Sequence, residues 1–153
     1  MGSRVPEVLD ALVALARADA ALADVRVSDG PEVTDSSAKD WLIVGFDGDP
    51  AGDFQAAQTL GGWAGLGARS REEQFQVMVA AIAQRGDTDV RAARVRAYEI
   101  GARVEEWLAA DPSIGLGRGE VEAAIEASQL TQDQTDRGAQ AVLLLTVAGK
   151  CFT

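Results

Sequence analysis

Three glutamates, Glu120, Glu122 and Glu126, alternate with apolar residues and are the side chains whose spacing could best support chemistry. Alternation places side chains on one face of a β-strand, so the three carboxylates are expected to share that face. Paired carboxylates can do general acid–base work. A solvated sheet face, or one lining a shared acidic channel, explains the same pattern better than acid–base work does.

A second acidic group, Asp47, Asp49 and Asp53, lies in the segment FDGDPAGD. Oxygen ligands at such short spacing are what calcium requires. However, Pro50 and Ala51 stand where further ligands would be, and the closing bidentate glutamate is missing. The segment is therefore interpreted as a turn that ends a strand, and no metal site is predicted.

The glycine-rich segment LGGWAGLG contains Trp63 and Leu66. Glycines can form a phosphate cradle, but no GK[ST] follows them and no G-x-G-x-x-G opens a helix after a buried strand. We instead predict a mobile loop within Ala51–Ser70, whose Trp63 and Leu66 pack on the domain or on a partner. Part of this range is also compatible with a strand.

The chain has no histidine and one cysteine, Cys151. This removes the Ser-His and Cys-His nucleophile pairs, histidine-ligated metals, cysteine-based zinc sites and any intrachain disulfide. Cys151 is interpreted as an unreactive thiol. The sequence therefore predicts no catalytic residue, no cofactor and no enzymatic activity.

The formal net charge of −10 argues against a protein that binds nucleic acid through broad phosphate neutralisation. Arg91 and Arg94, close to Arg85 and Arg96, could form a local basic patch, although a solvated helix face explains them as well. No apolar run approaches the length of a membrane span, and acidic and basic residues interrupt Met1–Ala23, which excludes a signal peptide. The protein is expected to remain in the cytoplasm of the cell that makes it.

A long helix is predicted over Thr88–Ala110, with Asp87 or Thr88 as its cap and Asp111-Pro112 as its end. Apolar residues recur every three or four positions and form one stripe. They are Val90, Ala93, Ala97, Ile100, Val104, Trp107 and Leu108. This stripe predicts a helix that lies across an apolar surface, which the flanking alternating segments identify as a β-sheet.

A second helix is predicted over Val5–Ala23, with Pro6 in its first turn. Alternation and β-branched composition predict further strands: Asp24–Ser28, Asp40–Phe46, Glu73–Gln84, Glu120–Ser128 and Ala139–Ala148. The last is apolar on both sides, which predicts a central strand covered on each face. The alanine and glutamate content of Glu120–Ser128 would also permit a helix, but its alternation favours a strand. Gln129–Arg137 is polar and is interpreted as a connection that Leu130 could shorten.

Together these segments predict one domain, residues 1–153, of the α+β class. Its mainly antiparallel sheet of four to five strands carries the N-terminal helix and the long helix packed on it. Short connections between successive strands favour the antiparallel arrangement.

The order of elements is similar to that of the small tail-terminator, or tail-completion, proteins of long-tailed phages and related gene transfer agents. The resemblance covers nearly the whole chain and rests on the N-terminal helix followed by VRVSDGP, DWLIVGF, EEQFQVMVAAIAQRGD, LAADPSIGL, EVEAAIEASQL and TDRGAQAVLLLTVAGK. None of these motifs is catalytic, and the joint order carries the resemblance.

The resemblance implies a structural virion protein made in the host cytoplasm and located at the neck of the tail. It implies a ring, expected to be hexameric, that stops growth of the tail tube and contacts the tube protein and the head–tail connector. DNA would pass through without specific binding, which suits an acidic chain. Candidate interface residues are Trp63, Leu66, Arg91, Arg94, Glu120, Glu122 and Glu126.

Two other roles remain open. Neck and connector proteins of similar size share this order of elements. A small ligand-binding or enzymatic α+β domain with a carboxylate site, or a general interaction module, is also compatible with the sequence.

Overall fold

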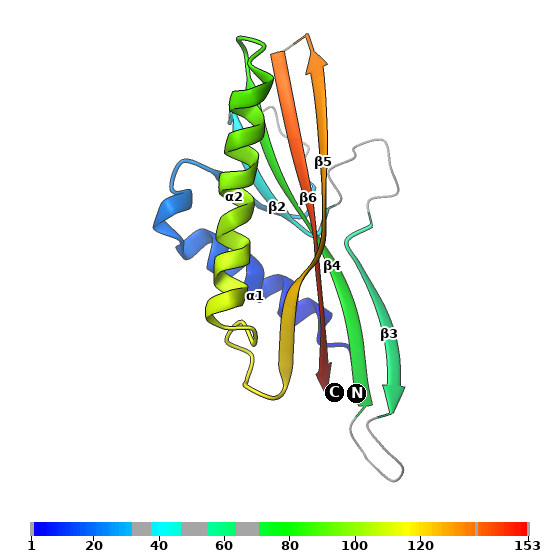
Figure 1. Cartoon of the computed structure of the whole chain (residues 1–153). Helices are drawn as coiled ribbons and strands as arrows, with labels where there is room; N and C mark the ends of the chain where they lie inside the picture. Colours follow the sequence, from blue (N-terminus) through cyan, green and yellow to red (C-terminus); the bar gives the residue numbers. More distant parts are fainter. Residues whose placement is uncertain (1, 32–37, 47–54, 64–70, 137, 153) are drawn as a thin grey trace.

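Two helices cover one face of a six-stranded, mainly antiparallel sheet in the computed structural model, which describes residues 2–31, 38–46, 55–63, 71–136 and 138–152 (Figure 1). This confirms the predicted α+β class and the packing of both helices on the sheet. The sheet has one strand more than the largest number expected.

The N-terminal helix α1 spans Val5–Ala18, shorter than predicted. The backbone of Asp19 turns to an extended conformation and a short 3₁₀ turn, η1, follows over Ala20–Leu22. The Asp19 carboxylate accepts the N–H of Ala21, so it caps the new turn in place of continuing the first helix. Apolar residues at helical spacing, such as Val8 and Leu12, are buried against the sheet.

The long helix α2 spans Val90–Ala110 and begins two residues later than predicted. Its cap is Asp89, whose carboxylate accepts the N–H of Ala92 at 3.0 Å, and not Asp87 or Thr88. Thr88 has a φ of 63°, which takes it out of the helical region. The helix ends at Asp111, as Asp111-Pro112 predicted.

The predicted stripe on α2 faces the sheet. Ala93, Ala97, Ile100, Val104 and Leu108 are buried, while Val90 and Trp107 are half-buried and pack against the same core. Gly101 lies so close to β6 (Gly138–Phe152) that an added Cβ would meet the Leu143 side chain at 2.7 Å. Small residues therefore bring the helix close to the sheet.

The remaining strands are β1 (Arg26–Asp29), β2 (Asp40–Val44), β3 (Ala57–Trp63), β4 (Arg71–Arg85) and β5 (Val121–Thr135). The order across the sheet is β1-β2-β4-β6-β5, and β3 pairs with the half of β4 that β2 leaves free. Only β1 and β2 run parallel. Consequently β5 forms one edge of the sheet, while β3 and β1 form the other.

Two predicted connections are wrong in part. Gln129–Arg137 is not a polar connection, because β5 continues to Thr135 with β6 as its partner. An edge strand can be polar throughout, since one of its sides faces solvent. Within Ala51–Ser70, residues Ala57–Trp63 form β3, and the rest of the predicted loop lies largely outside the described residues.

The two faces of the sheet differ. Odd-numbered residues of β4 and β6, such as Phe75, Val79 and Leu143, are buried beneath the helices. Even-numbered residues of β6 from Gln140 to Ala148 are only half-buried, so the prediction that helices or other elements fully cover both faces of this strand is wrong. A smaller apolar cluster of Ile43, Phe46, Ala80 and Ile82 lies on this second face.

Candidate functional site: an open groove across the sheet

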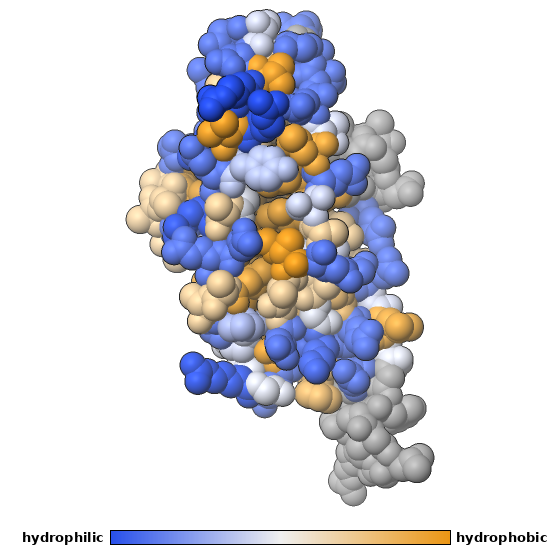
Figure 2. Space-filling model, in the orientation of Figure 1, coloured by the Kyte–Doolittle hydropathy of each residue, from blue (hydrophilic) through white to orange (hydrophobic). Residues whose placement is uncertain are grey.

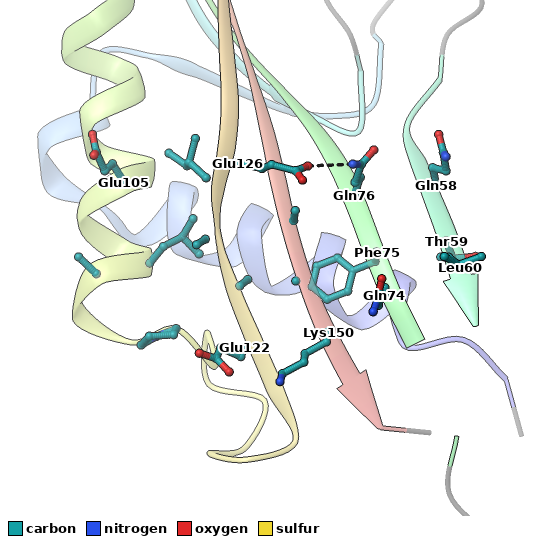
Figure 3. Close-up of a pocket in the computed structure, with 18 residues that line it drawn as sticks. Gln58, Thr59, Leu60, Gln74, Phe75, Gln76, Glu105, Glu122, Glu126 and Lys150 are labelled. Carbon is teal, nitrogen blue, oxygen red and sulfur yellow. Dashed lines mark hydrogen bonds between the residues drawn. The ribbon is translucent and has the colours of Figure 1, made fainter. Parts of the chain in front are cut away.

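A broad, open groove of about 860 Å³ lies across strands β3, β4, β5 and β6 (Figure 3). We call it the sheet groove. Four strands supply its polar lining, and one end reaches the last turns of α2. Its lining includes Gln58, Leu60, Gln74, Gln76, Glu105, Glu122, Glu126 and Lys150.

Strand register places these side chains side by side. Gln74 lies opposite Lys150 on β6, which in turn lies opposite Glu122 on β5. On the other side of β4, Leu60 of β3 lies opposite Gln74, and Gln58 lies opposite Gln76. Since residues opposite one another share a face, the alternation within each strand produces a continuous row of polar groups across the sheet.

The carboxylate row predicted for β5 is interrupted. Glu126 occupies a β-bulge, because Ile125 pairs with Val147 while Ala127 pairs with the adjacent Thr146. The extra residue shifts the alternation, so Ala127 is exposed and does not continue the buried side. The Glu126 side chain reaches across β6 and accepts a hydrogen bond from Nε2 of Gln76 at 2.8 Å (Figure 3).

Glu120 does not join the other two glutamates in the groove. It lies in the turn before β5 and accepts a hydrogen bond from Nη1 of Arg4 at 3.4 Å. The prediction that Glu120, Glu122 and Glu126 share one strand face is therefore wrong for Glu120. Only Glu122 and Glu126 line the groove, from either end of a short stretch of β5.

An aromatic ring underlies the groove where the neighbouring strands β5 and β6 approach closely. Phe75 extends from β4 toward β6 at the level of Gly149 (Figure 3). A Cβ on Gly149 would lie 2.8 Å from the Phe75 ring and 2.0 Å from the carbonyl oxygen of Glu122. Glycine is therefore required here, because it lets the ring and the neighbouring strand approach the same point.

The predicted interface arginines lie at the start of α2. Arg91 is exposed, and Nη1 of Arg94 donates to Oε1 of Gln132 on β5 at 2.8 Å. Beside them, Val95 and Tyr98 are exposed, and Leu130 of β5 borders the same shallow hollow. Arg91 and Arg94 are thus brought near an apolar surface that the sequence analysis did not identify.

Two further arginines, Arg96 of α2 and Arg85 of β4, form ion pairs inside the fold. Arg96 donates to the buried Asp40 at 3.0 Å, and Arg85 of β4 donates to the other oxygen of that carboxylate at 2.8 Å. Burial lowers the pKa of Arg96, but hydrogen bonds to Asp40 and Glu99 outweigh this effect and raise it. Of the predicted basic cluster, Arg85 and Arg96 are therefore engaged in ion pairs within the fold.

A second network joins α1 to α2. The Asp19 carboxylate accepts hydrogen bonds from Nε of Arg103 and Nε1 of Trp107, both at 2.8 Å. Burial alone would raise the pKa of Asp19, but these two bonds and the Ala21 N–H lower it below its ordinary value. The charged form is thus stabilised inside the fold.

Cys151 is buried near the end of β6, where its thiol donates to Oε1 of Glu73 at 3.3 Å. Burial and this acceptor raise the pKa of Cys151 to about 12. A thiol with so high a pKa is a poor nucleophile. This agrees with the interpretation of Cys151 as unreactive.

The remaining candidates lie at the end of β3 or outside the described residues. Trp63 is the last residue of β3, opposite Arg71 of β4. Leu66 and the acidic residues Asp47, Asp49 and Asp53 lie outside the described residues. Across the described ranges, no three Asp, Glu, Cys or His side chains are grouped so that they could hold a metal ion.

The groove can form many hydrogen bonds and attract positive charge, because it presents amides and carboxylates on a wide open surface. Its amides, Lys150 and Leu60 were not among the predicted site residues. The alternation of Gln74 and Gln76 around Phe75 could have revealed them, since it marks a polar strand face. Such a surface suits contact with a macromolecule better than it suits enclosure of a small substrate.

No protein-family profile matches the chain, and no curated protein sequence resembles it significantly. Neither helix of the described structure is long and apolar enough to cross a membrane.

Proposed function

We propose that this chain is the subunit of a ring that ends the growing tail tube of a phage or phage-like particle and joins it to the head connector. The observation that carries the proposal is the pair of unlike sheet edges beside a helix-free face. Among the described strands β5 pairs only with β6, and β3 pairs only with β4. A ring built head to tail requires two different surfaces on each subunit, which this arrangement offers.

The resemblance in the order of elements supplies the particular role. The fold agrees with the α+β class that this resemblance implies, and β4, β5 and β6 are each 15 residues long. Long strands give each subunit an extended surface that can bridge the tube below and the connector above. The net charge of −10 fits a ring through which DNA passes without being held.

The test is to add the purified chain to tail-tube protein from the same particle during polymerisation and to image the tubes by electron microscopy. The proposal expects a ring of extra density at one end of each tube. Bare ends on every tube would contradict it.

A second candidate is a ligand-binding or enzymatic role for the sheet groove, favoured by its volume and by Glu122 and Glu126. Saturable turnover or binding of a small molecule that is lost in Glu122→Gln and in Glu126→Gln would support this alternative. Absence of such an effect while tubes are capped would favour the structural role.

A further inference from the structure

An apolar patch remains exposed on the outer side of α2, in contrast to most large apolar side chains of the described structure. It consists of Val95, Tyr98, Ala102 and Leu130, and we call it the helix patch. Val95 is 39% and Tyr98 46% exposed. Figure 2, in the orientation of Figure 1, shows apolar side chains at the surface between α2 and β5. An exposed apolar patch with a polar border is typical of a protein-binding surface.

Arg94 borders this patch, with Arg91 one turn earlier on α2, while the carboxylate at the same border, Glu99, is paired with Arg96. Within the described part of the chain, Arg91 and Arg94 make no ion pair, whereas Arg96 and Arg103 of the same helix each pair with carboxylates. The partner of Arg94 is the neutral amide of Gln132. Both cations are therefore available to a carboxylate of another molecule.

The sheet groove has the complementary character. Glu105, Glu122 and Glu126 line it with Lys150 as the one cation among its lining residues, and no ion pair is found for these three carboxylates in the described part of the chain. Beside them Leu60 is 70% exposed, the most exposed of the large apolar residues described. The groove thus combines acidic charge with an exposed apolar side chain.

We propose that the helix patch of one copy of this chain docks on the sheet groove of a second copy. In this contact Arg91 and Arg94 lie against Glu122 and Glu126, and the apolar patch lies against Leu60. The occupant is a second copy because one molecule carries both complementary halves. A chain with a net charge of −10 repels itself in general, so stable association requires local complementarity of this kind.

The contact joins two different surfaces, so it repeats head to tail. For closure of this contact into a ring, the inference rests on the proposed function. The proposed contact specifies which two surfaces of neighbouring subunits meet.

Two double variants test the contact by sedimentation velocity at low ionic strength. Arg91→Glu with Arg94→Glu makes both surfaces acidic, and Glu122→Arg with Glu126→Arg makes both basic. Each variant alone should associate at least about tenfold more weakly than the wild type, because like charges then meet. An equal mixture should restore association, since each variant complements the other.

General charge effects predict a different result. The Glu122→Arg, Glu126→Arg variant is less negative overall and would associate more strongly than the wild type if only net charge mattered. Matched controls place the same charge changes on α1, β1 and Lys39. These controls are Arg17→Glu with Lys39→Glu, and Asp10→Arg with Asp29→Arg, all at exposed positions. They should associate like the wild type.

Three results would overturn the inference: a wild type that is monomeric even at about 1 mM, a mixture that fails to restore association, or association that stops at a closed dimer. These results are separate from the test of function. If the wild type caps tubes and both double variants cap equally well, the contact is wrong and the function stands. If the charge exchange restores association but no tube is capped, the contact stands and the function is wrong.

Discussion

The Asp19 carboxylate is the residue that most directly ties the N-terminal part of the chain to the long helix. It accepts hydrogen bonds from Arg103, Trp107 and the N–H of Ala21, and its side chain is 8% exposed. Loss of this group leaves the indole N–H of the half-buried Trp107 without its acceptor. A buried donor without a partner is costly, and this determines the expected effect of a substitution.

We predict that Asp19→Ala lowers the free energy of unfolding by about 1–3 kcal/mol, the usual cost of leaving buried polar groups unpaired. Urea denaturation monitored by tryptophan fluorescence measures the change. Asp10→Ala, at an exposed position of α1, is the control and should change stability by less than about 0.5 kcal/mol. Equal stability of the two variants would show that the Asp19 network contributes nothing.

The same carboxylate predicts a pH dependence. The pKa of Asp19 is lowered in the folded protein from its ordinary 3.8, so its contribution to stability is present above that value. It is lost as the pH falls through the lower folded pKa. The stability difference between wild type and Asp19→Ala, measured from pH 6 downward, should therefore shrink below about pH 4. A difference that grows on acidification would contradict the assigned network.

Cys151 provides a probe of the folded state, because it is the only cysteine and its thiol is buried with a pKa of about 12. We predict that a thiol-specific reagent at pH 8 labels the native protein no faster than the fold opens around Cys151. Labelling should accelerate as denaturant is added. Complete labelling within seconds of mixing with native protein would show that the thiol is accessible.

At the scale of elements, the close approach of β5 to its neighbour β6 depends on Gly149. An added methyl group would meet the carbonyl oxygen of Glu122, which belongs to the neighbouring strand and cannot move aside alone. We predict that Gly149→Ala lowers the free energy of unfolding by at least about 1–3 kcal/mol, the range for overpacked sites. Gly2→Ala, where no atom lies within 4 Å, is the control. Similar melting curves for both variants would contradict this close approach of β5 to β6.

The helices and the buried strands were predictable from the sequence because burial imposes a period on apolar residues. The stripe from Ala93 to Leu108 identified α2, and the runs in β2, β4 and β6 identified the centre of the sheet. The edge strands were less predictable. The second half of β5 is exposed on nearly all sides and carries little apolar periodicity, while β3 contains glycines that favour a loop.

The candidate site was only partly predictable. Glu122 and Glu126 were identified from alternation alone, but alternation assumes an uninterrupted strand, and the bulge at Glu126 violates that assumption. The ion pair of Glu120 with Arg4 joins residues 116 positions apart. No local pattern reveals such a contact, nor the neighbouring positions of α2 and Leu130 that form the helix patch.

The whole molecule has one helix-covered face, which contains the main core, and a broad groove that four strands and the last turns of α2 line. The openness of the groove supports the proposed role in contacts with other proteins, because small-molecule sites are usually more enclosed. A ring subunit also needs contacts that are weak in free solution and become strong on a template. The tube end raises the effective concentration of neighbouring subunits and so drives closure of the ring.

The central claim is that this chain ends tube growth, and the length distribution of tubes tests it most directly. Tail-tube protein is polymerised alone and with increasing amounts of the chain, and tube lengths are measured by electron microscopy. The proposed function predicts that mean length falls as the chain is added and that each shortened tube carries one ring at a single end. Tubes whose length is independent of the added chain, with no ring at either end, would contradict it.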